Sequence, residues 1–156
     1  MLEKITNPAR SRQWAGSIPV EYVYTPGVAG EAFLRVLKDR GRLLTSRCRE
    51  CDITYLPARL YCERCLEETE DYQEVEPRGV VHAYTGAHRD LDGEPLHPPQ
   101  YYAFIRMPHT NGGMVHRLGK VKPDEVFIGL EVEAVLLPPE QRTGSINDIA
   151  YFQPVE

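Results

Sequence analysis

The chain has 156 residues, of which 42% are hydrophobic and 26% charged, a composition typical of one folded domain or two small ones and not of a disordered chain. Its net charge of −5 makes nucleic acid a poor default partner, because an acidic surface repels phosphate groups. No apolar run approaches the roughly 18 residues of a membrane-spanning helix, and no apolar signal segment opens the sequence, so we expect a cytoplasmic protein with no membrane partner.

The first predicted unit, residues 1–42, is an N-terminal arm followed by one helix. Prolines and glycines interrupt the arm, which carries large apolar side chains: Trp14, Val20, Tyr22 and Tyr24. The helix is predicted over residues 30–41, where apolar residues recur at helical spacing: Ala32, Phe33, Val36 and Leu37. Gly41 stands where a helix C-terminus belongs. The apolar face of this helix needs cover, either from the rest of the chain or from a partner.

The most informative feature is a pair of Cys-x2-Cys motifs within residues 43–78. Ten residues separate the motifs, and the four cysteines are Cys48, Cys51, Cys62 and Cys65. Two such turns can place four sulfur atoms at the corners of a tetrahedron, which Zn²⁺ accepts at Zn–S distances of about 2.3 Å. A module of about 35 residues is also too small to fold without such a staple. We therefore predict one structural zinc ion at these four cysteines.

Two other assignments of the cysteines stay open at this stage. Iron also accepts four sulfur ligands in a tetrahedron, and two disulfides would form in an oxidising compartment. A closed four-sulfur site has no open position for water or substrate, and it uses every cysteine in the chain. No thiol then remains as a nucleophile. Four arginines near the motifs would offset the negative charge of the thiolates: Arg47, Arg49, Arg59 and Arg64.

From residue 79 onward the sequence predicts a five-stranded barrel. Strand patterns cover residues 80–87, 101–107, 114–118, 130–137 and 146–152. A short helix is predicted within residues 122–129, between the third and fourth strands, and this order is typical of an OB-fold. In the fourth strand Val132, Ala134 and Leu136 alternate onto one face. Residues 88–100, 109–113 and 138–145 are predicted to be long connections.

No catalytic motif is present, and the histidines do not form a ligand-spaced pair. His116 lies in a predicted strand beside Arg117, so an acyl-CoA hydrolase or lyase that uses His116 or His88 is a minor alternative. Tyr102 and Phe104 share one strand face, where an aromatic ring could stack on adenine or on a nucleobase. A single-stranded nucleic-acid-binding protein is therefore the main alternative, although the acidic segment 66–76 weighs against it.

Several segments together resemble one known family. They are LKDRGRL, SRCRECDITYLPARLYCERC, an acidic spacer, GVVHAYTGAHR and GSINDIAYFQPV. The combination resembles the zinc-ribbon/OB-fold family long catalogued only as a domain of unknown function, over about residues 30–154. The resemblance implies a mainly β chain in three parts: an N-terminal helical segment (1–42), a rubredoxin-like zinc ribbon (43–78) and a C-terminal five-stranded OB-fold barrel (79–156). Asp52 and Leu66 stand where the cysteine turns of this family commonly have glycine, which predicts some turn strain.

The resemblance also implies a function, because family members are similar to small partners of acyl-CoA enzymes such as thiolases. We expect a non-catalytic, zinc-binding subunit that scaffolds a thiolase-like acyltransferase, contributes coenzyme A or acyl-CoA binding, and has no activity alone. The phosphates of coenzyme A require basic side chains. The candidates for this site are Arg106, Arg117, Lys120, Lys122, Tyr102, Phe104 and His116.

Overall fold

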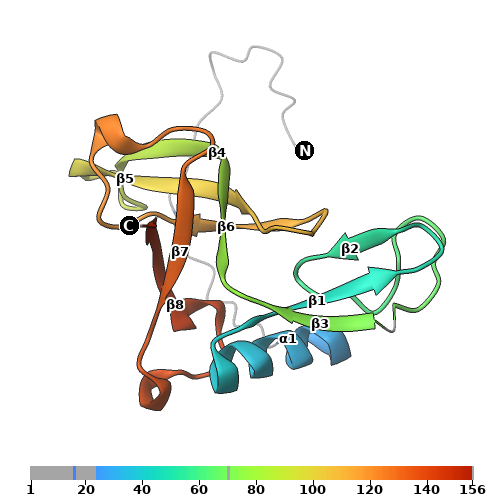
Figure 1. Cartoon of the computed structure of the whole chain (residues 1–156). Coiled ribbons are helices and arrows are strands. Elements are labelled where there is room, and N and C mark those ends of the chain that lie inside the picture. The colour runs from blue at the N-terminus through green and yellow to red at the C-terminus, as the bar shows by residue number, and fades with distance from the viewer. Residues whose placement is uncertain (1–15, 17–23, 70, 156) are drawn as a thin grey trace, which may run out of the picture.

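The structure is a computed structural model that describes Gly16 and residues 24–69 and 71–155, so Trp14, Val20 and Tyr22 lie outside the described residues. The described residues form the α-helix α1, a three-stranded sheet and a five-stranded sheet. Figure 1 shows how these elements are arranged. In chain order the elements are α1 (Gly27–Arg40), β1 (Leu43–Cys48), β2 (Ile53–Tyr55), β3 (Asp71–Val75), β4 (Arg78–Arg89), β5 (Pro95–Arg106), β6 (Gly113–Arg117), η2 (Pro123–Glu125), β7 (Glu131–Leu136), η3 (Pro139–Gln141), η4 (Ile146–Asp148) and β8 (Ile149–Pro154). Among the described residues, no helix is long and apolar enough to span a membrane.

The helix α1 begins three residues earlier than predicted, directly after Pro26, which suits a helix start because its backbone has no N–H to leave unpaired. Its end agrees with the prediction: Gly41 adopts a left-handed φ of 65° and its N–H bonds to the Leu37 carbonyl at 3.0 Å. Phe33 and Leu37 are 3% and 0% exposed. The chain itself therefore covers the apolar face of the helix, while Tyr24 is 80% exposed.

The five-stranded sheet has the order β6-β5-β4-β7-β8, with every neighbouring pair antiparallel. A parallel bridge between Leu118 and Phe152 joins the two ends and closes the barrel. Inward-facing Val132 is fully buried, and Ala134 and Leu136 pack against the same core, as their alternation predicts. The mainly β architecture with a helix, a ribbon and an OB-fold barrel is confirmed.

Three local predictions were wrong in the barrel. Residues 88–100 are not a long connection, because β4 and β5 continue as a hairpin to a tight turn in which the Asp90 carboxylate accepts the N–H groups of Asp92 and Glu94. The short helix within residues 122–129 is a single 3₁₀ turn. The last strand begins at Ile149, because residues 146–148 form a 3₁₀ turn that the Ser145 side chain caps.

One hydrophobic core joins all three parts of the chain. It contains Leu37 of α1, Leu44 and Leu56 of the ribbon, and Ile105 and Phe152 of the barrel. At the other end of the ribbon, a second and much smaller cluster consists of Ile53, Tyr55 and three of the cysteines, without Cys65. The base of the ribbon is thus stabilised by the barrel and helix, whereas its tip has almost no apolar core.

The β5–β6 connection docks on the ribbon, a role that the sequence analysis did not assign to it (Figure 1). The Asn111 N–H donates to the Thr54 carbonyl at 2.8 Å, and the Thr54 N–H donates to Asn111 Oδ1 at 2.9 Å. A Cβ atom at Gly112 would lie 2.5 Å from the Leu56 carbonyl oxygen. Glycine is therefore required where the barrel hairpin contacts the ribbon backbone.

We predict that Gly112→Ala lowers the free energy of unfolding by about 1–3 kcal/mol, because the new methyl group meets backbone atoms that cannot rotate away. Urea denaturation followed by circular dichroism measures the change. The control is Gly16→Ala, where the added Cβ meets no atom within 4 Å. If Gly112→Ala is as stable as the wild type, the β5–β6 hairpin does not pack against the ribbon backbone at Gly112.

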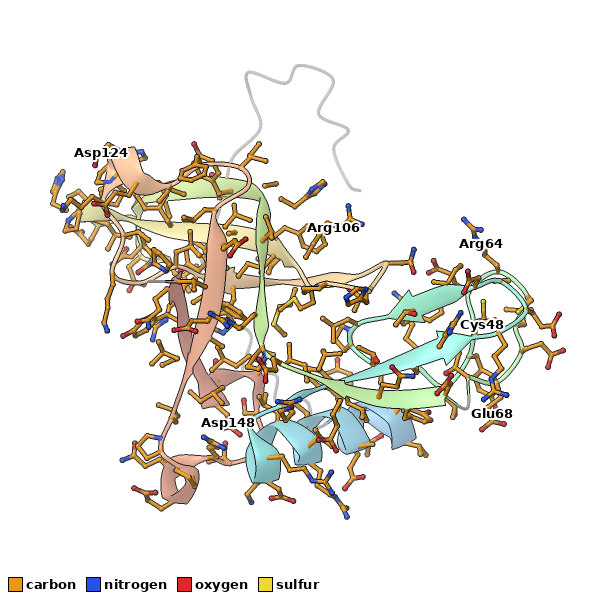
Figure 2. The ribbon with its side chains drawn as sticks, in the orientation of Figure 1. Cys48, Arg64, Glu68, Arg106, Asp124 and Asp148 are labelled. Atoms are coloured by element: carbon orange, nitrogen blue, oxygen red, sulfur yellow. The ribbon has the colours of Figure 1, made fainter. Side chains whose placement is uncertain are left out.

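Asp148 organises the connection between β7 and β8, beside the C-terminal end of α1 (Figure 2). Its carboxylate is 1% exposed and accepts backbone N–H groups from Thr143 and Gly144 at 2.9 Å and from Ser145 at 3.3 Å. Burial alone would raise the pKa of Asp148, but these donors outweigh it and lower the pKa below its usual range. The ionised form is thus favoured by folding.

We expect Asp148→Asn to destabilise the protein by about 1–3 kcal/mol at neutral pH, because an amide cannot accept the same set of N–H bonds. The stabilisation from Asp148 is complete above its ordinary pKa of about 4 and is lost as the pH falls through the lower folded-state pKa. The variant should therefore lose less stability than the wild type below pH 4. Melting temperatures across pH 2–7 would test this, with the exposed Asp124→Asn as the control.

Candidate metal centre and barrel surface

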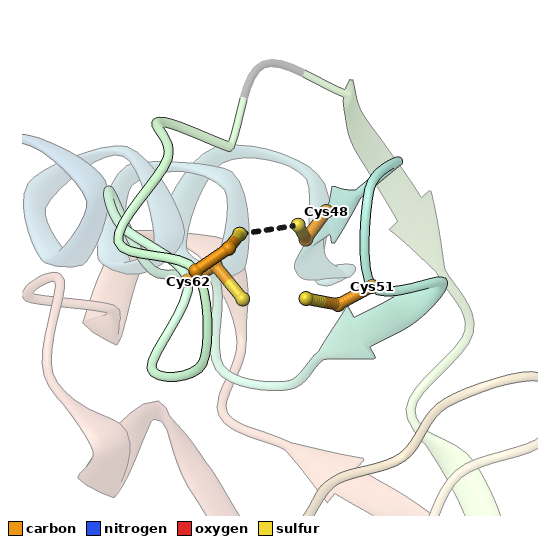
Figure 3. A group of neighbouring side chains, drawn as sticks. Cys48, Cys51 and Cys62 are labelled. Atoms are coloured by element: carbon orange, nitrogen blue, oxygen red, sulfur yellow. Dashed lines mark hydrogen bonds between the residues drawn. The ribbon is translucent and has the colours of Figure 1, made fainter.

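The four cysteines converge at the tip of the ribbon. Cys48 ends β1 and Cys51 follows in the turn before β2, while Cys62 and Cys65 belong to the segment before β3. All four Sγ atoms lie within 4.8 Å of one another, and those of Cys48 and Cys65 are 3.4 Å apart. Figure 3 shows the sulfur atoms of Cys48, Cys51 and Cys62 pointing into a common space. Tetrahedral zinc with 2.3 Å bonds requires sulfur separations of about 3.8 Å, so the donor set fits the ion.

Both cysteine turns contain a residue with left-handed backbone geometry. Asp52 has a φ of 53° and Leu66 a φ of 63°, at the two positions where the sequence lacks the usual glycine. A side chain in this conformation costs roughly 1 kcal/mol or more. The predicted turn strain is therefore present, and the turns persist because the surrounding backbone bonds, such as Leu66 N–H to the Cys62 carbonyl at 3.0 Å, hold them.

Hydrogen bonds prepare one cysteine as a thiolate before any metal binds. The Tyr55 hydroxyl lies 3.2 Å from Cys62 Sγ, and with backbone N–H groups of Cys65 and Arg64 it lowers the pKa of Cys62 to about 6. A hydrogen bond with Cys65, together with burial, instead raises the pKa of Cys51 to about 12. Metal binding must therefore displace the Cys51 proton, which makes loading of the site dependent on pH.

Three of the four arginines near the motifs form ion pairs with carboxylates. Arg47 pairs with Asp52 at 2.5 Å, Arg49 with Asp71 at 3.9 Å and Arg59 with Glu63 at 2.7 Å. Arg64 forms no ion pair with a described residue and lies at the outer end of the ribbon (Figure 2). The direct hydrogen-bond donors to Cys62 are instead the Tyr55 hydroxyl and the Arg64 backbone N–H.

The residues predicted to contact coenzyme A divide into separate groups. Tyr102 is 41% exposed and Phe104 is half-buried on the outer face of β5, opposite the buried Ala103 and Ile105. Arg117 lies directly across from Tyr102 on β6, and its Nε donates to the Ala150 carbonyl. These three side chains therefore belong to one region of the barrel surface.

The other four candidates are less well grouped. His116 pairs with Ala103 on the inner face, packs on Phe152 at 5.7 Å between ring centroids, and has a pKa that burial lowers. Arg106 is exposed but stands four residues from Tyr102, roughly 13 Å along the strand. Lys120 is exposed with a left-handed φ of 54°, and Lys122 pairs with Glu125 at 3.0 Å.

A shallow pocket beside Tyr102 was missed by the sequence analysis. It encloses about 460 Å³ and is lined by Ala87, Arg89, Asp90, Leu91, Leu96, Gln100 and Tyr102. Leu91 is fully exposed at the tip of the β4–β5 hairpin. The Asp92-Gly93 pair in this turn is a hairpin signal that would have predicted the arrangement.

We predict that metal analysis of the purified protein gives one zinc ion per chain. Cys62→Ser should lower the zinc content and the melting temperature together, because metal binding and folding of the ribbon are linked. Arg64→Gln is the control, since only its backbone N–H contacts Cys62. A red protein that contains iron, or a metal-free protein without free thiols, would contradict the zinc assignment.

Comparison with known proteins assigns the two folded parts of the chain. Residues 35–70 match the family model of the ChsH2 rubredoxin-like zinc ribbon domain, and residues 72–137 match that of the ChsH2 C-terminal OB-fold domain. A DUF35 domain-containing scaffold protein from Methanocaldococcus jannaschii is 29% identical over an alignment of 126 residues that covers 78% of this chain and 88% of that protein.

Two solved structures have the same fold. A DUF35 family protein of unknown function from Sulfolobus solfataricus has 29% identity and a TM-score of 0.61, over 82% of this chain and 84% of its own. An Ltp2-ChsH2(DUF35) aldolase has 24% identity and a TM-score of 0.54, over 80% and 93% of the two chains. The segment that matches the zinc-ribbon model contains all four cysteines, which supports zinc as the ion that they bind. The chain belongs to the zinc-ribbon/OB-fold family of DUF35 proteins.

Proposed function

We propose that this protein is a non-catalytic subunit that assembles with an acyl-CoA-processing enzyme of the thiolase type and supplies part of the coenzyme A site. Two relatives support an assembly role: one is named a scaffold protein, and another is described as an Ltp2-ChsH2(DUF35) aldolase.

The observation that carries this proposal is the closed metal centre. All four cysteines point at one another, so a zinc ion bound there has no open position at which to activate water or substrate. Among the described residues, no other cluster of three or more histidine, cysteine or carboxylate ligands could hold a metal ion. His116, the strongest acid–base candidate from the sequence, faces the barrel interior. These features favour a scaffold over an independent hydrolase or lyase.

The barrel surface around Tyr102 is the proposed site for the nucleotide end of coenzyme A. An exposed aromatic ring can stack on adenine, and Arg117 across the strand pair can approach a phosphate. Phe104 extends the aromatic face, and Lys120 adds a second cation close by in sequence. The ion pair of Lys122 with Glu125 makes it a weaker candidate for phosphate binding.

We predict that Lys120→Glu and Arg117→Glu each weaken coenzyme A binding about tenfold or more, as expected when a charge-assisted contact becomes repulsive. Titration calorimetry on the zinc-loaded protein measures the affinity. Arg78→Glu is the control, because Arg78 pairs with Glu133 where β4 meets β7. If neither Arg117 nor Lys120 affects the affinity, the proposed site is wrong.

The partner is tested by co-expression of the tagged chain with a thiolase-type acyl-CoA enzyme from the same organism, followed by size-exclusion chromatography with light scattering. A defined complex is expected, with turnover of acyl-CoA only when both chains are present. Turnover by this chain alone, abolished in His116→Ala, would favour the independent enzyme. Tight binding of a short single-stranded oligonucleotide at physiological salt would favour the nucleic-acid-binding alternative.

A further inference from the structure

Tyr55 is the one buried tyrosine of the ribbon, and its hydroxyl faces the metal centre. The residue ends β2 and is 5% exposed. Its hydroxyl lies 3.2 Å from Cys62 Sγ and also accepts the Glu63 N–H at 3.2 Å. We propose that Tyr55 is a positioning residue of the zinc centre, which donates a hydrogen bond to the Cys62 thiolate and sets how strongly that sulfur donates to the metal.

The direction of this hydrogen bond follows from the groups involved. A metal-bound thiolate has lone pairs and no proton, so it can only accept. The Glu63 N–H can only donate, and it already points at the Tyr55 oxygen. The phenolic proton must therefore point at Cys62, which gives a polarised chain from backbone N–H through hydroxyl to sulfur.

Arg59 holds the Tyr55 ring in this orientation. Its guanidinium lies 4.9 Å from the ring centroid and is fixed by an ion pair with Glu63 at 2.7 Å. The Arg59 backbone is pinned as well, because Ser46 Oγ bonds to both its N–H and its carbonyl at 2.9 Å. Thr69 Oγ1 donates to the same carbonyl. A cation over the ring also withdraws electron density, which makes the hydroxyl a stronger donor.

This contact connects the two halves of the site. Tyr55 follows the first cysteine turn in the chain, whereas Cys62 begins the second. Partners of metal ligands orient them and tune their basicity, and the loss of such a partner typically costs 10–100-fold in metal affinity. The proposal concerns only the zinc ribbon and does not depend on the proposed partner or on coenzyme A.

The test uses the full chain with Co²⁺ in place of zinc and compares Tyr55→Phe with the wild type. Without the hydrogen bond, the Cys62 thiolate donates more charge, so the sulfur-to-cobalt charge-transfer band should move to lower energy. Zinc affinity, measured against a chelator, should nevertheless fall about tenfold, because the Cys62 side chain loses the partner that orients it toward the metal. Tyr61→Phe is the matched control, since Tyr61 is 56% exposed beside the same cysteine, and it should leave both readouts unchanged.

Each outcome decides the proposal. An unshifted band would show that the ring only fills space, even if the affinity falls. Cadmium-substituted wild-type protein gives a check that needs no variant: the Tyr55 hydroxyl proton should show scalar coupling to ¹¹³Cd through the sulfur. Absence of that coupling would overturn the proposal if Tyr55→Phe failed to fold. A protein that binds no Co²⁺ with a tetrahedral spectrum would instead refute the zinc site itself.

Discussion

The ribbon cannot fold by itself, because a segment of about 35 residues buries too little apolar surface to offset its loss of conformational entropy. Two anchors compensate for this. At the tip, four sulfur atoms converge on one metal position, and the small cluster around them consists mostly of the ligands themselves. At the base, Leu44 and Leu56 join the core shared with the helix and the barrel.

Beyond this shared core, hydrogen bonds connect the barrel to the ribbon and to the helix. The β5–β6 hairpin bonds to the ribbon backbone through Asn111, so the barrel supports the ribbon along one side. Arg142 in turn donates to the carbonyls of Leu137 and Lys38, which ties the β7–β8 connection to the C-terminal end of α1. Helix, ribbon and barrel therefore form one supported body, which is the mechanical property that a scaffolding subunit needs.

The two ends of this body have different chemistry. At the ribbon tip, N–H and O–H donors satisfy the sulfur atoms, and nearby arginines are engaged by carboxylates. On the barrel, the strand alternation sends Ala103 and Ile105 inward and leaves Tyr102 and Phe104 outside. The four-cysteine tip and the exposed aromatic face of the barrel are therefore chemically distinct parts of the molecule.

The sequence alone determined the features that depend on short-range geometry. The spacing of Cys48 to Cys65 predicts the four-sulfur site, Gly41 marks the end of the helix, and alternation identifies the inner face of β7. Tertiary structure decided the rest. Prolines and charges made residues 88–100 resemble a loop, but pairing between β4 and β5 makes them the end of a hairpin. The cover of the helix face, the pairing of Arg49 with Asp71 and the inward position of His116 likewise depend on residues distant in the chain, which no local pattern encodes.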